Sequence, residues 1–150
     1  MKQTEQVAEI EISYRPAISN KPIIKSSLDA YNVVAPFFPS NTIALQEKFV
    51  AMYLNRANRV LGVYELSNGG ISGTVVDIRL LLSVALKTAA SGIILCHNHP
   101  SGNLQPSAQD KEITQKIIAA SKLLDITILD HMIVCPENTF YSFADEGIIS

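Results

Sequence analysis

The sequence predicts an α/β (α+β) domain in which helices flank a mixed central sheet. Residues 93–97 form a short, continuous apolar run that ends in a histidine, which is typical of a strand at the centre of a sheet. Two segments with helical spacing, about 77–90 and 107–124, lie between runs with the composition of strands. Because helices and strands alternate without a strict βαβ repeat, we expect a mixed sheet rather than a purely parallel one.

The first 45 residues are predicted to be an N-terminal arm with a short strand and a short helix. Prolines at positions 16 and 22 and scattered polar residues favour an extended arm or an edge strand over Glu9–Tyr14. Ser26 or Ser27 can cap a short helix that runs towards Ala35, where the following prolines would end it.

Residues 46–150 are predicted to form the main domain, which begins with a β-hairpin. Aromatic and aliphatic residues favour a buried strand over 47–54 and a second strand over 59–66, joined by a polar turn. A short third strand is expected over 71–76. Asp77 is a plausible N-cap for the helix that follows and runs to about residue 90.

The second half of the main domain is predicted to contain the remaining strands. After the apolar run at 93–97, a loop is expected over 98–106 and a helix over 107–124. Residues 126–134 favour another buried strand, and a turn leads from it into a terminal strand over 139–143.

Composition limits the classes of protein that this chain can represent. With 150 residues, 47% of them hydrophobic and 17% charged, the chain is expected to fold as one globular unit. A net charge of −2 supplies no overall attraction for nucleic acid, although it leaves a local basic patch open. No apolar run approaches the roughly 20 residues that span a bilayer, and the polar first residues do not resemble a signal peptide. The two cysteines, Cys96 and Cys135, are interpreted as buried free thiols, which predicts a cytoplasmic protein.

His97 and His99 are candidate metal ligands at the end of the predicted central strand. Residues two apart in an extended segment point to the same side, so both imidazoles can converge on one ion. Asp110, early in the next helix, can return a carboxylate to that ion, and two histidines with a carboxylate are a common catalytic zinc set. The alternative is an ordinary turn with polar side chains, which a His-x-His pair ending a buried strand makes less favourable.

Ser107 and Asp110 also have a purely structural interpretation. Ser-x-x-Asp before an apolar helix resembles a capping box, in which both side chains serve the helix N-terminus. Spacing alone does not choose between a cap and a catalytic role for these residues.

The complete pattern resembles a known family. His97-x-His99, seven residues, Ser107, two residues and Asp110 match the JAMM (MPN-plus) zinc metalloprotease motif. The segment from about 46 to 149 is similar to the RadC subfamily. The similarity is carried by four stretches: His97-Asn98-His99-Pro100-Ser101-Gly102, Pro106-Ser107, Leu129-Asp130-His131 and Tyr141-Ser142-Phe143. The resemblance implies the JAB/MPN, cytidine-deaminase-like, architecture.

The resemblance also implies roles for the matching residues. His97, His99 and Asp110 would bind Zn²⁺, and Ser107 would stabilise the oxyanion of an acyl-transfer transition state. The family pattern includes an upstream glutamate as general base, and Glu47 stands at that position. Without the resemblance, Glu47 is better explained as a surface charge at the start of a strand.

Three further residues are weighed and set outside this predicted site. His131 is expected to be structural or to support a ligand rather than to bind the ion. Cys96 should point away from the histidines into the core. Arg79, usual in RadC-like chains, would bind substrate or pair with Asp77 or Glu65.

These patterns predict a zinc-dependent peptidase or isopeptidase that acts on a peptide or protein substrate of unknown identity. The first alternative is a RadC-type accessory protein in DNA repair or recombination without proteolytic activity. RadC-like proteins usually carry an N-terminal helical domain similar to helix-hairpin-helix modules, and the first 45 residues are too short for one. The second alternative is a peptide-binding scaffold that does not cleave. A homodimer is also considered, in which the apolar segment 33–38 would lie at the interface.

Overall fold

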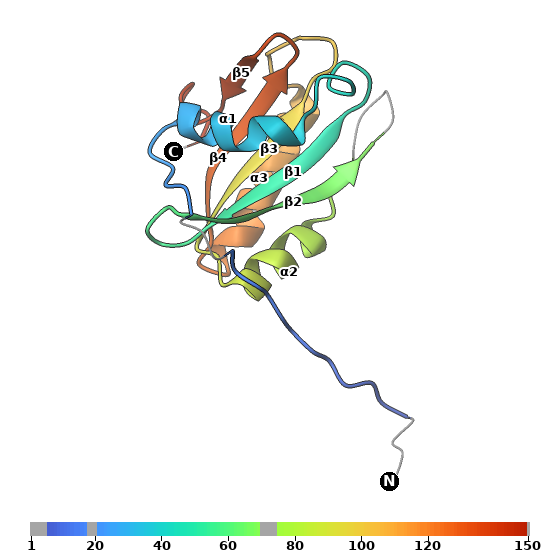
Figure 1. Ribbon diagram of the computed structural model, residues 1–150, viewed down its shortest axis with the longest axis vertical. Helices are drawn as coiled ribbons and strands as arrows, with labels where there is room; N and C mark the ends of the chain where they lie inside the picture. Colours follow the sequence, from blue (N-terminus) through green and yellow to red (C-terminus); the bar gives the residue numbers. More distant parts are fainter. Residues whose placement is uncertain (1–5, 18–20, 70–74, 150) are drawn as a thin grey trace.

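The computed structural model, which describes residues 6–17, 21–69 and 75–149, contains one five-stranded sheet with helices on both faces (Figure 1). In chain order the elements are α1 (Ser27–Val34), the short 3₁₀ helix η1 (Ala35–Phe37), β1 (Lys48–Leu54), β2 (Val60–Asn68), α2 (Ile78–Thr88), β3 (Gly92–Asn98), α3 (Ala108–Lys122), β4 (Thr127–Cys135) and β5 (Thr139–Ser142). These bounds confirm the predicted α/β class.

The strands pair in the order β2-β1-β3-β4-β5, which makes β3 the central strand. β3 pairs antiparallel with β1 and parallel with β4, and α3 provides the crossover that a parallel pair requires. The β1–β2 and β4–β5 pairs are antiparallel hairpins. The sheet is therefore mixed, as the irregular alternation of elements predicts.

The two faces of the sheet carry separate parts of the core. Leu95 of β3 packs in one cluster with Leu81 of α2 and Ile117 of α3. Cys96, the next residue, packs in the other cluster with Val34 of α1. Figure 1 shows this arrangement, with α1 on one face and α2 and α3 on the other. Because side chains alternate across a strand, His97 faces the α2–α3 side and Cys96 points away from it.

The predicted helix caps are present. The Ser26 hydroxyl accepts a hydrogen bond from the backbone N–H of Asp29 at the start of α1. At the start of α2, the Asp77 carboxylate accepts hydrogen bonds from the backbone N–H groups of Arg79 and Leu80. These bonds satisfy N–H groups that have no partner within the helix.

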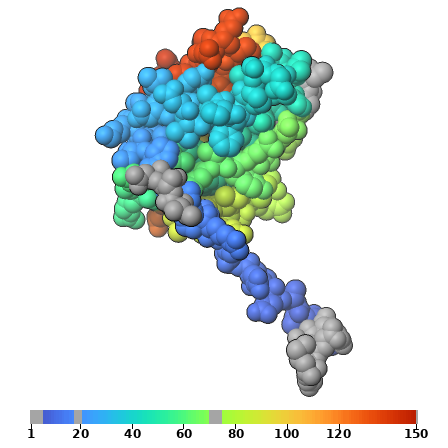
Figure 2. Space-filling view, viewed as in Figure 1, coloured from blue at the N-terminus to red at the C-terminus, as the bar shows by residue number. Residues whose placement is uncertain are grey.

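The N-terminal arm is extended, and the strand considered over Glu9–Tyr14 does not form. Figure 2 shows this segment projecting from the body of the molecule. A strand needs a neighbouring backbone for its N–H and C=O groups, whereas in this segment it is a side chain, the Tyr14 hydroxyl, that donates to the Leu61 carbonyl at 2.6 Å. Closer to the body, Ile23 forms an isolated antiparallel bridge with Arg59, the residue before β2.

Two further expectations have different outcomes. The strand expected over 71–76 lies mostly outside the described residues, and Val75 and Val76 are not in a strand. In the apolar segment 33–38, Val34 and Phe38 are buried in the core, whereas Pro36 and Phe37 are exposed. A homodimer through this segment stays a prediction.

Both cysteines are buried free thiols, as predicted. Burial, together with the nearby Asp130 carboxylate, raises the pKa of Cys96 well above its ordinary value. Over residues 6–17, 21–69 and 75–149, no helix is both long enough and apolar enough to cross a membrane.

Candidate metal centre

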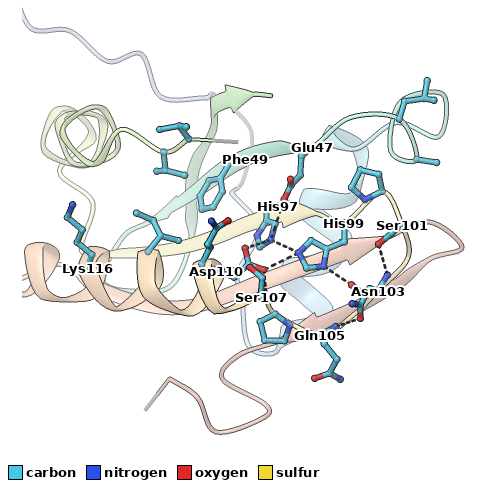
Figure 3. Close-up of a pocket in the computed structure, with 18 residues that line it drawn as sticks. Glu47, Phe49, His97, His99, Ser101, Asn103, Gln105, Ser107, Asp110 and Lys116 are labelled. Atoms are coloured by element: carbon cyan, nitrogen blue, oxygen red, sulfur yellow. Dashed lines mark hydrogen bonds and ion pairs between the residues drawn. The ribbon is translucent and has the colours of Figure 1, made fainter. Parts of the chain in front are cut away.

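Three predicted ligands meet where β3 ends and α3 begins (Figure 3). The Nε2 atoms of His97 and His99 are 3.0 Å apart. The two carboxylate oxygens of Asp110 lie 3.3 Å from His97 Nε2 and 3.1 Å from His99 Nε2. A group of donor atoms this close, with room above it, can hold a metal ion.

Local structure explains why the two histidines converge. β3 ends at Asn98, but the backbone N–H of His99 still donates to the Val134 carbonyl at 3.0 Å, so the extended pairing with β4 continues through His99. Both imidazoles therefore point to one side. The chain then turns at Gly102, which has a φ of 85° and donates its N–H to the His99 carbonyl at 3.0 Å. This turn favours glycine and brings the chain back towards α3.

Ser107 and Asp110 form the predicted capping box, and Asp110 also belongs to the cluster. The Ser107 hydroxyl accepts from the backbone N–H of Asp110 at 3.0 Å, and Asp110 Oδ2 accepts from the backbone N–H of Ser107 at 2.8 Å. The same Oδ2 atom lies 3.1 Å from His99 Nε2. Asp110 can therefore cap α3 and contact the histidines at the same time.

The electrostatic environment favours an ionised Asp110. Burial raises the pKa of this carboxyl, but the adjacent His97 and His99 imidazoles, together with the backbone N–H of Ser107, outweigh burial and hold the pKa well below its ordinary value. Burial likewise lowers the pKa of His99, while the hydrogen bonds to Asp110 and to the Asn103 carbonyl give a net rise. The centre therefore has a fixed negative charge with a basic imidazole beside it.

Glu47 reaches the cluster from the residue before β1. Its Oε1 atom lies 4.0 Å from His97 Nε2, and its side chain is 17% exposed. Donor atoms of Glu47, His97 and His99 all lie within 4.8 Å of one another, which makes this group a second candidate set for a metal ion. His97 and His99 belong to both sets, and the contacts of 3.0–3.3 Å in the set with Asp110 are shorter and involve both of its carboxylate oxygens.

Asn98 is a buried contributor that sequence reasoning did not single out. Its Oδ1 accepts from the backbone N–H of Lys48 at 2.7 Å. Its Nδ2 donates to the carbonyls of Ile43 at 2.8 Å and Gln46 at 3.0 Å. These bonds hold the chain on both sides of Glu47 against the end of β3. The signal in the sequence that could have identified Asn98 is its position between two histidines, which places its amide on the opposite side of the strand.

His131 lies behind His97 rather than among the candidate ligands. Its Nε2 atom is 2.8 Å from Nδ1 of His97, the ring nitrogen that points away from Asp110. Its Nδ1 atom is 2.6 Å from the Thr114 hydroxyl of α3. Burial, and then the proximity of His97, lower the pKa of His131 well below its ordinary value. Thr114 is a second buried contributor that sequence reasoning did not select.

A cavity of about 1020 Å³ lies over the cluster. Phe49, Val76 and Ile113 contribute apolar lining, and Figure 3 shows Ser101, Asn103 and Gln105 on the other side of the histidines from Phe49. Ser107 also lines the cavity. The space is therefore wide, open and apolar on one side.

Arg79 lies outside this cavity lining. Its Nε atom is 3.5 Å from Asp77 Oδ1, and its side chain is 94% exposed. Arg79 was expected to bind substrate or to pair with Asp77 or Glu65, and the structure shows the ion pair with Asp77.

Comparison with known proteins places the chain in a family. Residues 24–148 match the RadC-like JAB domain. A UPF0758 protein of Flavobacterium johnsoniae is 48% identical over 125 residues, which cover 83% of this chain and 53% of that protein. A UPF0758 protein of Porphyromonas gingivalis is 37% identical over 151 residues, which cover 99% of this chain and 65% of that protein.

Further relatives show the same partial coverage. The UPF0758 protein YfjY of Escherichia coli is 42% identical over 104 residues, which cover 69% of this chain and 64% of that protein. The chain thus spans between about half and two thirds of the length of these relatives. From the extent of the domain match and from these identities, we conclude that the chain belongs to the RadC-like JAB domain family.

Proposed function

We propose that this chain is a zinc-dependent hydrolase that cleaves a peptide or isopeptide bond. His97, His99 and Asp110 would hold the ion, Glu47 would act as general base, and Ser107 would stabilise the oxyanion. The observation that carries the proposal is the cluster formed by the two histidine Nε2 atoms, 3.0 Å apart, and the Asp110 carboxylate, whose Oδ1 and Oδ2 lie 3.3 Å from His97 and 3.1 Å from His99.

This spacing fits tetrahedral zinc. Zinc–nitrogen and zinc–oxygen bonds are about 2.0–2.2 Å long, so neighbouring donors around a tetrahedral ion are roughly 3.3–3.6 Å apart. The contacts of 3.0, 3.1 and 3.3 Å lie within about 0.3 Å of this range, so a small outward movement of the side chains would admit the ion. Two imidazoles and a carboxylate also match the borderline-soft character of the ion. The Asn103 carbonyl can only accept a hydrogen bond, so the 2.6 Å contact requires a proton on Nδ1 of His99. An uncharged His99 then presents the lone pair of Nε2 to the cluster.

A bound zinc ion would lower the pKa of a water ligand and polarise the substrate carbonyl. Glu47 lies 4.0 Å from His97 Nε2, so its carboxylate faces the space beside the cluster. From there Oε1 would accept a proton from the attacking water and pass it to the leaving nitrogen.

Ser107 is suited to donate a hydrogen bond in the transition state. Its oxygen accepts from the backbone N–H of Asp110, which occupies an acceptor site and leaves its own O–H proton available. Ser107 is exposed to the cavity, so this proton can point at a carbonyl oxygen that gains negative charge. A cavity of about 1020 Å³ accommodates an extended peptide segment, which supports a peptide or protein as substrate.

Elemental analysis of the purified protein, with zinc titration of the metal-free form, tests the ligand assignment. We expect one zinc per wild-type chain and its loss in His97→Ala and Asp110→Ala. Wild-type protein that takes up no zinc on titration would contradict the proposal.

A library of peptides and isopeptides tests the chemistry, with zinc-loaded wild type compared against Glu47→Gln. We expect Glu47→Gln to keep its zinc and to lose cleavage by at least about 100-fold, in line with the contribution of a general base. Glu112→Gln is the matched control, because Glu112 lies on the exposed side of α3 and is not among the cavity lining residues. Equal cleavage by wild type and Glu47→Gln would exclude the proposed base.

A further inference from the structure

We infer that Thr114 and His131 are positioning residues that set the tautomer of His97. They direct the proton of His97 to Nδ1, so that Nε2 presents a lone pair to the ion. This inference rests on the proposed metal ligands, and it adds a role for two buried side chains that do not face the cavity.

The assignment begins at a backbone carbonyl. The Thr114 hydroxyl lies 2.6 Å from the carbonyl oxygen of Asp110, four residues earlier in α3. A carbonyl can only accept, so Thr114 donates its single hydroxyl proton there. The Thr114 oxygen must then accept in its other contact, which joins it to Nδ1 of His131 at 2.6 Å. His131 therefore carries a proton on Nδ1.

The second step passes through the His131 ring. This ring is fully buried, where a charged imidazolium is costly, so a single proton on the ring is favoured. With that proton on Nδ1, Nε2 of His131 has a lone pair, and its 2.8 Å partner is Nδ1 of His97. Nδ1 of His97 must donate this hydrogen bond.

The third step reaches the metal centre. A neutral His97 with its proton on Nδ1 has an unprotonated Nε2, the atom that lies 3.0 Å from His99 Nε2 and 3.3 Å from Asp110 Oδ1. If every hydrogen bond between these side chains ran in the opposite direction, the proton of His97 would lie on Nε2 and would prevent this atom from binding an ion. This reversal would also leave the Thr114 hydroxyl with two acceptors for one proton, and so would cost a buried hydrogen bond.

Packing holds the rings of this relay in place. His131 stacks on Phe143 with ring centroids 4.6 Å apart, and it meets Phe49 edge-on at 5.5 Å. His97 in turn stacks on Phe49 at 5.7 Å. Asp110 contacts both the first and the last residue of this hydrogen-bonded series: its carboxylate contacts His97, and its backbone carbonyl accepts from Thr114. A shift of α3 would therefore disturb ligand position and ligand tautomer together.

Three variants isolate the Thr114 hydroxyl. Thr114→Val replaces the hydroxyl with a methyl group of similar size, and Thr114→Ser keeps the hydroxyl. Thr88→Val is the matched control, because the Thr88 hydroxyl donates at 2.9 Å to the Val84 carbonyl, also four residues earlier in its helix, and contacts no histidine. Thermal denaturation of each variant verifies that it is folded.

The first readout is the tautomer of each histidine, measured by ¹⁵N NMR of the metal-free wild-type protein. We expect protons on Nδ1 of both His97 and His131, and a loss of the single Nδ1 form of His131 in Thr114→Val. A wild-type His131 with its proton on Nε2 would overturn the inference without any variant or metal being required.

The second readout is the zinc dissociation constant, measured by competition with a chelator. Loss of a group that supports a ligand typically weakens metal binding about 10–100-fold, and we expect this loss in Thr114→Val, rescue in Thr114→Ser and no change in Thr88→Val. Unchanged zinc binding by folded Thr114→Val would overturn the positioning role. Failure of the wild type to bind zinc would contradict the proposed function instead. The tautomer measurement would still decide which ring nitrogen of His97 and of His131 carries the proton.

Discussion

Ser107 and Asp110 exchange two hydrogen bonds at the start of α3, and one atom of Asp110 also faces the metal centre. Asp110 Oδ2 accepts from the backbone N–H of Ser107 at 2.8 Å and lies 3.1 Å from His99 Nε2. A helix cap and a candidate ligand therefore share a carboxylate. Since capping restrains the Asp110 side chain, the N-terminus of α3 orients it towards the histidines before any ion binds.

Ser107→Ala should affect stability and activity separately. Loss of the cap should lower the free energy of unfolding by about 1 kcal/mol, measured by urea denaturation. Loss of the oxyanion donor should lower kcat by about 100-fold or more on a substrate identified by the library screen, with zinc content unchanged.

Ser26→Ala provides the matched comparison, because the Ser26 hydroxyl caps α1 by accepting from Asp29 and lies in another helix. We expect a similar loss of stability and an unchanged kcat. If both variants retain wild-type kcat, Ser107 is only a cap.

Asn98→Asp should separate the position of Glu47 from metal binding. The substitution turns the amide that donates to Ile43 and Gln46 into an oxygen that faces two carbonyls. We expect a loss of about 1–3 kcal/mol in the free energy of unfolding, because the carbonyls lose their donor. Cleavage should fall as the Glu47 segment shifts, while zinc content stays near one per chain.

Asn55→Asp is the control for this charge change. The Asn55 side chain accepts from the backbone N–H groups of Ala57 and Arg59 through Oδ1, and aspartate can make the same bonds. We expect near wild-type stability and activity. Equal behaviour of the Asn98 and Asn55 variants would argue against the positioning of Glu47 by Asn98.

Removal of zinc should lower the melting temperature of the wild-type protein. An ion that binds only the folded chain stabilises it by about 2.7 kcal/mol when the free ion is at 100 times its dissociation constant. Addition of a chelator should therefore lower Tm in wild type and have no effect in Asp110→Ala, as measured by calorimetry. Asp77→Ala removes the cap of α2, outside the cluster, and should keep the full chelator effect. A chelator effect in Asp110→Ala equal to that of wild type would reject Asp110 as a ligand.

Alkaline pH should destabilise the protein through Tyr53. Burial raises the pKa of Tyr53 well above its ordinary value of 10.0, and its hydroxyl donates to the Leu81 carbonyl at 2.8 Å. Above about pH 10 the unfolded chain releases this proton while the folded chain keeps it, so the stability that is fully present below this pH falls as pH rises.

Tyr53→Phe removes this proton from both states. Near neutral pH the variant should lose about 1 kcal/mol, because one buried hydrogen bond is absent. Its free energy of unfolding should then fall less steeply than that of wild type above about pH 10, as measured by urea denaturation across pH. Identical alkaline slopes would show that Tyr53 does not account for the effect.

Several elements were predictable because their causes lie within a few residues. The apolar run at 93–97 indicates the central strand, and Asp77 marks the start of α2. The extended arm over Glu9–Tyr14 illustrates the limit of such reasoning. Its alternating composition suits a strand, but a strand forms only where a neighbouring backbone is free to pair.

The candidate site divides in the same way. The sequence by itself indicated that His97 and His99 share one side of the strand end, and it offered a capping box at Ser107 and Asp110 as one of two interpretations, because both relationships follow from local backbone geometry. With the family pattern, it also pointed to Glu47. That Glu47 reaches His97 was decided by the tertiary structure, where β1 pairs with β3 so that Phe49 lies opposite His97.

The contacts of Asn98, Thr114 and His131 were also decided by the tertiary structure. Asn98 is bonded to the segment before β1, and His131 meets His97 from the neighbouring strand and Thr114 from α3. Strand register and helix placement bring these distant residues together, and both depend on how the whole core packs. The spacing of residues along the chain points to the proposed ligands, whereas this packing determines which buried groups contact them.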